Sequence, residues 1–217
     1  MKKLGGPLFL AVLFLSLAAS QEPLAILAPR KPKVGDQIAI TYNVAAKSAI
    51  LRNVKVITAE LMIMRDGESP VLHELPMKMS GKVWKCSLKL TDEKARLLLL
   101  RFTSGEMIDD CGENVWDAMV YGRNGKPLKG AHYQRSTILM LGGFYELKRP
   151  KDLEGALAEI HEERQLYPDN WSVAPMRWSI LMQQKPGEET KRVVKEELEK
   201  FYTAHKLNED ALQAALF

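Results

Sequence analysis

Two cysteines are the residues of this sequence best suited to redox chemistry. Cys86 and Cys111 lie 25 positions apart. They therefore cannot form a Cys-x-x-Cys pair, in which both sulfurs share one turn and a helix N-terminus favours the thiolate. One interpretation is a structural disulfide between a core strand and the loop at 109–112. The alternative is two free thiols, with Cys86 buried as a small apolar residue. A disulfide would require Cα atoms about 4.4–6.8 Å apart.

Acidic residues around Cys111 raise the question of a calcium site. Their oxygen atoms come from Asp109, Asp110, Glu113, Asn114 and Asp117. An EF-hand loop needs such residues at alternate positions before a glycine, and this spacing is absent, so a solvated turn between two strands is favoured. The four histidines are His73, His132, His161 and His205. None belongs to an HExxH motif and no pair has helical ligand spacing, so no metal ligand is predicted.

The local motifs of common enzyme chemistry are absent. The sequence holds no GxSxG, GxxxxGK[ST] or GxGxxG segment, so acyl transfer, P-loop and dinucleotide chemistry have no support. We therefore predict no catalytic residue and no cofactor.

Tryptophans offer a different kind of site, an aromatic platform for a ligand. Trp171 and Trp178 are seven positions apart on one face of a predicted helix, although packing between adjacent helices is the favoured role. Trp116 and Trp84 could serve a carbohydrate-binding sandwich. Trp84 shares the expected core face, which argues against it.

The first twenty residues have the pattern of a removable signal peptide. Lys2 and Lys3 precede an apolar stretch at 8–19, and small residues end at Ser20 before Gln21. The alternative, an uncleaved anchor, is disfavoured because the apolar run is shorter than the ~20 residues of a spanning helix. We expect an extracytoplasmic protein, periplasmic or secreted, with no transmembrane segment after cleavage.

The charge of the remaining chain is close to balanced. The sequence has 31 basic and 27 acidic residues, and removing the two leader lysines leaves 31 − 2 − 27 = +2. Nucleic acid is therefore an unexpected partner. Two cysteines are too few for a disulfide scaffold.

The segment 24–125 has the pattern of short β-strands separated by turns. A half-buried strand is indicated by four apolar residues that alternate with polar or small ones, Ile38, Ile40, Tyr42 and Val44. Further runs cover 54–64, 71–79, 83–90, 97–102 and 115–121, and Asp66-Gly67 suits a tight hairpin. Within 83–90 the expected core face comprises Trp84, Cys86, Leu88 and Leu90. About seven short strands without intervening helices predict an antiparallel all-β sandwich of the immunoglobulin or fibronectin type.

A Gly/Pro-rich hinge at 122–130 separates this β region from a helical-hairpin domain, which we place at 131–217. A first helical segment, ended by Arg149-Pro150, is predicted from Ile138, Leu141, Phe144 and Tyr145. Gly142-Gly143 falls inside it and would permit close packing or a kink. Further helices are expected from the cap Asp152 to about 167, over 171–184 and 188–205, and after the cap Asn208. The short loops between them make antiparallel hairpins.

The helix at 188–205 has two different faces. Its lysines, arginines and glutamates are typical of a solvated surface with i,i+4 ion pairs. Its apolar face is expected to comprise Val194, Leu198, Phe201 and Tyr202.

Two resemblances extend this reading. Tyr167-Pro168-Asp169-Asn170 after an amphipathic helix resembles the end of a tetratricopeptide (TPR) unit, although the spacing to a faint second copy at 207–210 is not the standard one. The order of parts, with Lys33-Val34-Gly35-Asp36, Tyr42-Asn43 and the junction at 121–131, resembles the N-terminal region of bacterial extracytoplasmic thioredoxin-like proteins of the TlpA/ResA type. That resemblance implies a following thioredoxin-like domain that carries the Cys-x-x-Cys pair. This chain has neither, so no catalytic residue carries over.

The resemblance implies a non-catalytic binding or scaffold region of the cell envelope. Its partner would be an envelope protein or a C-terminal domain of the same chain. The alternatives are a fragment of a thiol-disulfide oxidoreductase and a stand-alone secreted carbohydrate- or protein-binding module. The apolar helical pattern up to Phe217 leads us to expect that the polypeptide continues beyond that residue.

Overall fold

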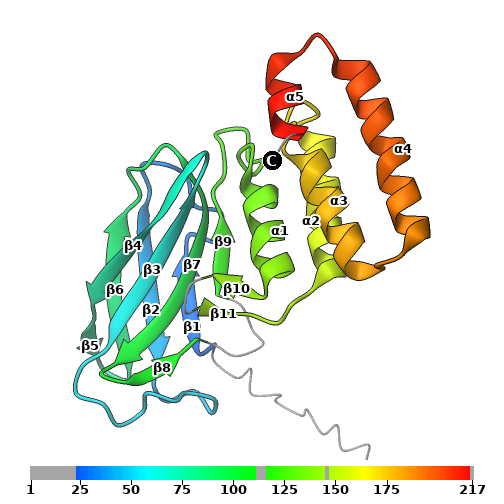
Figure 1. The fold of residues 1–217 in the computed structure, drawn as a ribbon. Helices are drawn as coiled ribbons and strands as arrows, with labels where there is room; N and C mark the ends of the chain where they lie inside the picture. Colours follow the sequence, from blue (N-terminus) through cyan, green and yellow to red (C-terminus); the bar gives the residue numbers. More distant parts are fainter. Residues whose placement is uncertain (1–22, 111–115, 145–146, 216–217) are drawn as a thin grey trace, which may run out of the picture.

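The structure is a computed structural model that describes residues 23–110, 116–144 and 147–215. The predicted leader and Cys111 lie outside these residues. Figure 1 shows two β-sheets on one side of the molecule and the helices on the other. The strands of the sheets are β1 (Ala25–Ala28), β2 (Gln37–Asn43), β3 (Thr58–Arg65), β4 (Glu68–Pro76), β5 (Lys78–Ser80), β6 (Val83–Lys89), β7 (Ala95–Ser104), β8 (Met107–Asp109) and β9 (Asp117–Met119). The later elements are α1 (Ala131–Leu141), β10 (Gly143–Phe144), β11 (Leu147–Lys148), α2 (Leu153–Leu166), α3 (Val173–Gln184), α4 (Glu188–His205) and α5 (Glu209–Ala215).

The two sheets are antiparallel. The first has the strand order β1-β2-β6-β5, and the second has the order β4-β3-β7-β8, with β9 also paired to β7. Several neighbours in a sheet are distant in the chain, such as β2 with β6 and β3 with β7. The prediction of antiparallel sheets followed by a helical region is confirmed.

The inner faces of the sheets pack around one apolar core. The first sheet contributes Ile38, Ile40, Tyr42 and Trp84, and the second contributes Leu61, Leu98, Leu100 and Phe102. In β2 the buried residues begin in alternation with exposed ones, as the period of two predicts. In β3 and β7 burial is almost continuous. Their uninterrupted apolar runs follow from this, because both faces of these strands are covered.

The hairpin between β3 and β4 forms where the sequence predicts it. Asp66-Gly67 connects the two strands, and Gly67 has a φ of 66°. This left-handed conformation is accessible to glycine without steric penalty, which explains why the turn is located there.

Helix α1 covers the outer face of the second sheet. A second apolar cluster joins Ala131 and Ile138 of α1 and Leu147 of β11 to five sheet residues, Met62, Met64, Leu97, Leu99 and Met119. The helical region therefore shares an apolar interface with the sheet that precedes it.

The first helix ends earlier than the sequence pattern predicts. It begins directly after Gly130 and ends at Leu141, whereas the apolar spacing predicted helical structure up to Tyr145. The reason is Gly142-Gly143, which is not a kink within a helix. Gly142 has a φ of 75° and its amide donates to the Ile138 carbonyl oxygen at 3.0 Å, so it ends the helix, and Gly143 starts β10.

The later helices agree with the sequence pattern. The Gly155 amide donates to the Asp152 carboxylate at 2.8 Å, and the Ala211 amide donates to the side-chain oxygen of Asn208 at 3.0 Å. Both residues cap the helices that follow them, as predicted. Helix α3 begins two residues later than expected, at Val173. Within the described part of the chain, none of the helices is long and apolar enough to cross a membrane.

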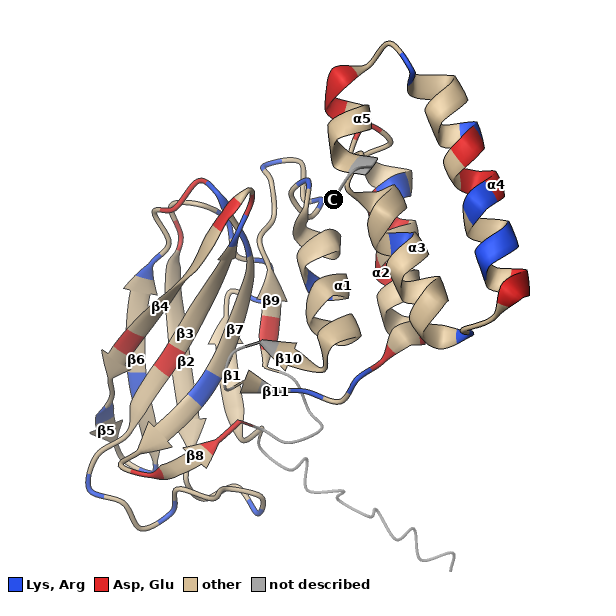
Figure 2. Cartoon of the chain, viewed as in Figure 1, with Lys and Arg blue, Asp and Glu red and all other residues tan. Residues whose placement is uncertain are grey.

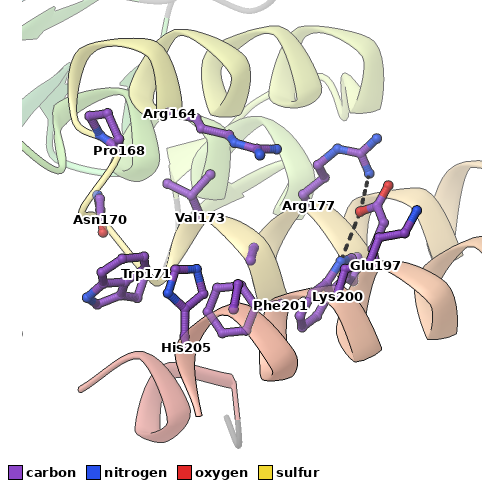
Figure 3. A pocket seen from close by; sticks show the side chains of 13 residues that line it. Arg164, Pro168, Asn170, Trp171, Val173, Arg177, Glu197, Lys200, Phe201 and His205 are labelled. Atoms are coloured by element: carbon purple, nitrogen blue, oxygen red, sulfur yellow. Dashed lines mark hydrogen bonds and ion pairs between the residues drawn. The ribbon is translucent and has the colours of Figure 1, made fainter. Parts of the chain in front are cut away.

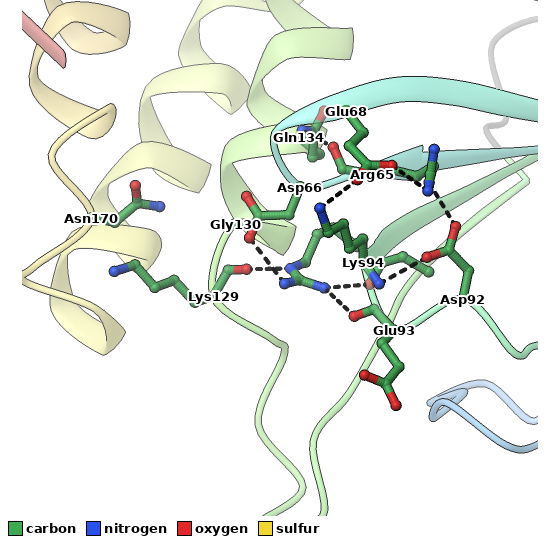
Figure 4. A network of polar contacts seen from close by, with 12 residues as sticks. Arg65, Asp66, Glu68, Asp92, Glu93, Lys94, Lys129, Gly130, Gln134 and Asn170 are labelled. Atoms are coloured by element: carbon green, nitrogen blue, oxygen red, sulfur yellow. Dashed lines mark hydrogen bonds and ion pairs between the residues drawn. The ribbon is translucent and has the colours of Figure 1, made fainter. Parts of the chain in front are cut away.

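Polar contacts hold the segment that connects the sheets to α1 (Figure 4). The Arg96 guanidinium donates to the Lys129 carbonyl oxygen at 2.6 Å and to the Asp66 carboxylate at 2.9 Å. The Gln134 side chain donates to the Arg65 carbonyl oxygen at 3.1 Å. The start of α1 is thus tied to the turn between β3 and β4.

Candidate functional site

A pocket of about 400 Å³ lies between the α2–α3 loop, α3 and α4 (Figure 3). It is lined by Arg164 of α2, by Pro168, Asn170 and Trp171 of the loop, by Val173, Ala174, Arg177 and Trp178 of α3, and by Glu197, Lys200, Phe201, Ala204 and His205 of α4. The α4 residues lie three, four, seven and eight positions after Glu197, which places them on one face of that helix.

The aromatic side chains of this pocket contact one another. The His205 ring lies between Trp171 and Phe201, with centroid distances of 4.5 and 4.7 Å. Trp178 meets Phe201 edge to face at 5.8 Å. Trp178 of α3 packs against α4, as predicted. Trp171 lies in the loop before α3 and not on the same helix, but it also packs against α4. Both rings line the pocket.

Glu197 holds two groups at one end of the pocket. One of its carboxylate oxygens accepts from the Trp178 indole at 3.1 Å and from the Arg177 guanidinium at 3.0 Å. The negative charge of Glu197 is thus already paired with a side chain of α3. Arg164 and Lys200 are exposed, and neither has an ion-pair partner among the residues that the structure describes. The rim therefore has an excess of positive charge.

A buried carboxylate positions the loop that carries Trp171. Glu163 of α2 is fully buried, and it accepts from the Asn170 side chain at 2.7 Å and from the Gly130 amide at 2.6 Å. The amides of His132 and Tyr133 donate to its other oxygen at 3.2 and 3.4 Å. One side chain thus fixes both the start of α1 and the loop at the pocket.

The pocket is suited to binding. Its rings offer apolar contact surface, while Arg164 and Lys200 offer positive charge for a carboxylate or phosphate. Across the described residues there is no group of three His, Cys, Asp or Glu side chains that could hold a metal ion. His205 is the histidine that lines the pocket, whereas His132 contacts Glu159 at 2.5 Å near the sheet.

The sequence indicated only part of this site. The sequence pattern does not single out Arg164, Glu197 and Phe201 as site residues, and it predicts an ordinary solvated face for the charged residues of α4. Ion pairs such as Arg192–Glu196 confirm that description for the outer side of the helix. The predicted apolar face is partly wrong, because Leu198 and Tyr202 are exposed. Helix α4 contacts α3 through Glu197 and Phe201, and it contacts Trp171 of the α2–α3 loop through His205. The spacing of four between these α4 residues was the available signal.

Cys86 lies on β6 opposite Ile40 and is half-buried against the core. Burial raises the pKa of its thiol to about 11. It has no disulfide partner among the described residues. Because Cys111 lies outside them, the predicted disulfide between Cys86 and Cys111 stays a prediction.

The sheet tryptophans contact the core. Trp84 is buried, as its place on the core face predicted. Trp116 packs edge to face against Phe102 with a centroid distance of 5.1 Å. The buried Trp84 ring therefore offers no open face on which a sugar could stack, whereas Trp116 is half-buried.

Comparisons with known proteins give little further information. No protein-family model matches the chain, and no curated protein matches its sequence. Among solved structures the chain is similar to Cwp6 from Clostridium difficile, at 10% sequence identity and a TM-score of 0.31. The match covers 72% of this chain and 28% of the Cwp6 chain, so this chain spans less than a third of that length. At this level of similarity neither a fold family nor a function is transferred.

Proposed function

We propose that this chain is a non-catalytic binding module of the cell envelope, periplasmic or secreted, which holds a segment of a partner protein between α3 and α4. The observation that carries this proposal is the pocket of about 400 Å³ with its aromatic lining and its cationic rim. Pockets of roughly 300–1,000 Å³ are typical of ligand sites in proteins.

The lining defines the chemistry of the segment. Trp171 and Phe201 would contact an aromatic or long aliphatic side chain, while Arg164 and Lys200 would attract carboxylates next to it. The expected ligand is therefore a short acidic peptide segment with at least one large apolar residue. Its source would be another envelope protein or a C-terminal domain of the same chain.

The finer architecture belongs to the same proposal. The two packed sheets would form an immunoglobulin- or fibronectin-like sandwich, and the helical hairpins would be TPR-like. Together they would form the accessory N-terminal region of a TlpA/ResA-type thiol-disulfide oxidoreductase. The order of parts supports this assignment. Partner recognition is then the role left to this region, because the redox chemistry of such proteins resides in a separate domain.

Peptide binding tests the proposed function. Fluorescein-labelled hexapeptides would carry a central Leu-Phe pair flanked by Asp, Asn or Lys, and binding would be followed by fluorescence anisotropy. We expect the Asp-flanked peptide to bind about tenfold tighter than the Asn-flanked one. An Asp-flanked peptide with Ser in place of both Leu and Phe should bind as weakly as the Asn-flanked peptide. Equal or tighter binding of the Lys-flanked peptide would contradict the proposal.

Variants locate the binding in the pocket. Trp171→Ala and Lys200→Gln should each weaken binding of the Asp-flanked peptide by about tenfold. Lys195→Gln is the matched control, because Lys195 is exposed on the same helix but does not line the pocket. An unchanged Kd in both pocket variants would exclude this site.

A disulfide-reduction assay addresses the alternative function. A non-catalytic module should be inert with insulin as the disulfide substrate and dithiothreitol as the reductant. Turnover that is lost in Cys86→Ser or Cys111→Ser would instead support an oxidoreductase. The raised pKa of Cys86 favours the inert outcome, because the thiolate is the reactive species.

A further inference from the structure

Five large apolar side chains are exposed at one end of the two sheets. Ile50 and Val56 lie in the loop between β2 and β3, Met79 lies in β5, and Met107 and Ile108 lie in β8. Each of them exposes between 42% and 59% of its surface. Exposed apolar residues that gather in one place mark interaction surfaces far more often than single ones do.

Strand pairing brings these segments together. A ladder crosses the second sheet at this end through Pro76, Thr58, Thr103 and Ile108. The Met77 amide donates to the Ile57 carbonyl oxygen at 2.9 Å, which joins the β2–β3 loop to the start of β5. The Ile50 amide donates to the Asp109 carboxylate at 3.3 Å, which joins the same loop to β8. We name the exposed residues of 44–57, 77–82 and 104–108 the sheet-end surface.

The sheet-end surface is strongly basic. Its charged side chains are Lys47, Arg52, Lys55, Lys78 and Lys82, with Glu106 as the single acid of the three segments. None of these four lysines pairs with a carboxylate in the part of the chain that the structure describes. Figure 2 shows this basic character along the loop beneath β5 and β8.

The loop has a defined conformation. The Arg52 guanidinium donates to the Ala49 carbonyl oxygen at 3.0 Å and to that of Ala46 at 3.2 Å. The buried side chains of Ala46, Ala49 and Leu51 anchor it to the core. Ile50 and Val56 are thus presented outward from a fixed backbone.

We propose that the sheet-end surface docks on an anionic membrane surface. A bilayer interface accepts apolar side chains at the level of the acyl chains and places anionic headgroups around them, where the lysines lie. A soluble polyanion would satisfy the lysines but would leave the apolar side chains in water, so the combination favours lipid. Helices α3 and α4 lie away from this end (Figure 1), which leaves the pocket accessible while the sheets contact the membrane.

Vesicle sedimentation of the chain without its leader tests this inference. Phosphatidylcholine vesicles with phosphatidylglycerol should bind the protein, and pure phosphatidylcholine vesicles should bind it at least about tenfold more weakly. Added salt should reduce the binding. Equal binding to both compositions would overturn the proposal.

Two pairs of substitutions separate the two contributions. Lys47→Gln with Lys55→Gln removes charge, and Ile50→Ser with Val56→Ser removes apolar contact. Each pair should lower the partition coefficient by about tenfold or more. The matched control for the charge pair is Lys195→Gln with Lys206→Gln, and the control for the apolar pair is Val71→Ser with Leu72→Ser. These four residues are exposed but lie outside the sheet-end surface, so both control variants should bind vesicles as the parent protein does. Because all these residues are exposed, circular dichroism should show unchanged folding.

Other outcomes would contradict the inference. If the lysine pair weakens binding but the Ile50 and Val56 pair does not, the surface is a general polyanion site. The conclusion would be the same if heparin bound the protein as tightly as the vesicles do and if the substitutions weakened both kinds of binding equally. The four substitutions should leave peptide binding at the pocket unchanged, so failure of the membrane inference and failure of the proposed function are distinguishable.

Discussion

The Cys86 thiol shows how a strand position controls reactivity. Strand β6 places this side chain on the same side as Trp84 and Leu88, against the core between the sheets. Loss of solvation disfavours the thiolate and raises the pKa to about 11. At neutral pH the thiol is therefore protonated and a poor nucleophile.

This burial predicts slow alkylation. In a Cys111→Ser variant, which has one cysteine, iodoacetamide should modify Cys86 at pH 8 about a hundredfold more slowly than a peptide cysteine. Because the pKa of Cys86 is raised in the folded state, the alkylation rate should keep rising with pH until the pH passes about 11. In urea the same variant should reach half of its maximal rate near pH 8.5, about the pKa of an unburied thiol. Mass spectrometry measures both profiles, and rapid labelling of the folded protein at pH 7 would show that the thiolate is stabilised.

At the scale of the elements, helix α1 depends on another helix for its N-terminal cap. Gly130 precedes α1 with a φ of 89° and has no side chain that could accept from the first amides. Glu163 of α2 supplies the carboxylate to Gly130, His132 and Tyr133. Its negative charge also lies at the positive end of the α1 dipole. The cap therefore forms only when α1 and α2 are packed.

Substitution of this carboxylate should destabilise the fold. Glu163→Ala leaves buried amide donors without an acceptor and should lower the free energy of unfolding by about 3 kcal/mol. Glu162→Ala is the matched control, because Glu162 is the exposed neighbour, and it should stay within about 0.5 kcal/mol of the parent. Urea denaturation followed by circular dichroism measures both. Equal effects would show that the cap contributes nothing.

At the scale of the whole molecule, the sheets and the helices share an apolar interface. Met62 and Leu99 on the outer face of the second sheet pack in one cluster with Ile138 of α1. Arg96 of β7 also donates to Lys129, just before α1, and to Asp66 in the β3–β4 turn, which ties the start of the helical region to the second sheet. We therefore expect the predicted boundary at 125–131 to connect parts that unfold together.

Ile138→Ala tests this coupling. The lost packing should cost about 3 kcal/mol, and peptides from β7 and from α1 should lose hydrogen-exchange protection to the same extent in urea. Leu141→Ala is the control on the same helix, because Leu141 is exposed. If only the helical peptides lose protection, the sheets are stable independently of α1.

Much of the local structure was predictable because it depends on neighbouring residues. Asp66-Gly67 encodes its hairpin, Asp152 and Asn208 encode helix caps, and the bounds of α4 match the sequence pattern. The error at Gly142-Gly143 also has a local cause. Apolar spacing continued past a glycine that ends the helix, and the glycine conformation outweighed the spacing.

The sequence by itself determined the order of the elements and which face of most strands and helices is apolar, since these follow from periods of two and 3.6 residues and from turn chemistry. Only the tertiary structure decided which surfaces meet. Trp171 and His205 are 34 positions apart, and their ring centroids lie 4.5 Å from each other. The Ile50 amide in the β2–β3 loop donates to Asp109 of β8, which brings two distant segments to one surface. These convergences depend on strand pairing and helix packing between distant segments, which no local pattern records.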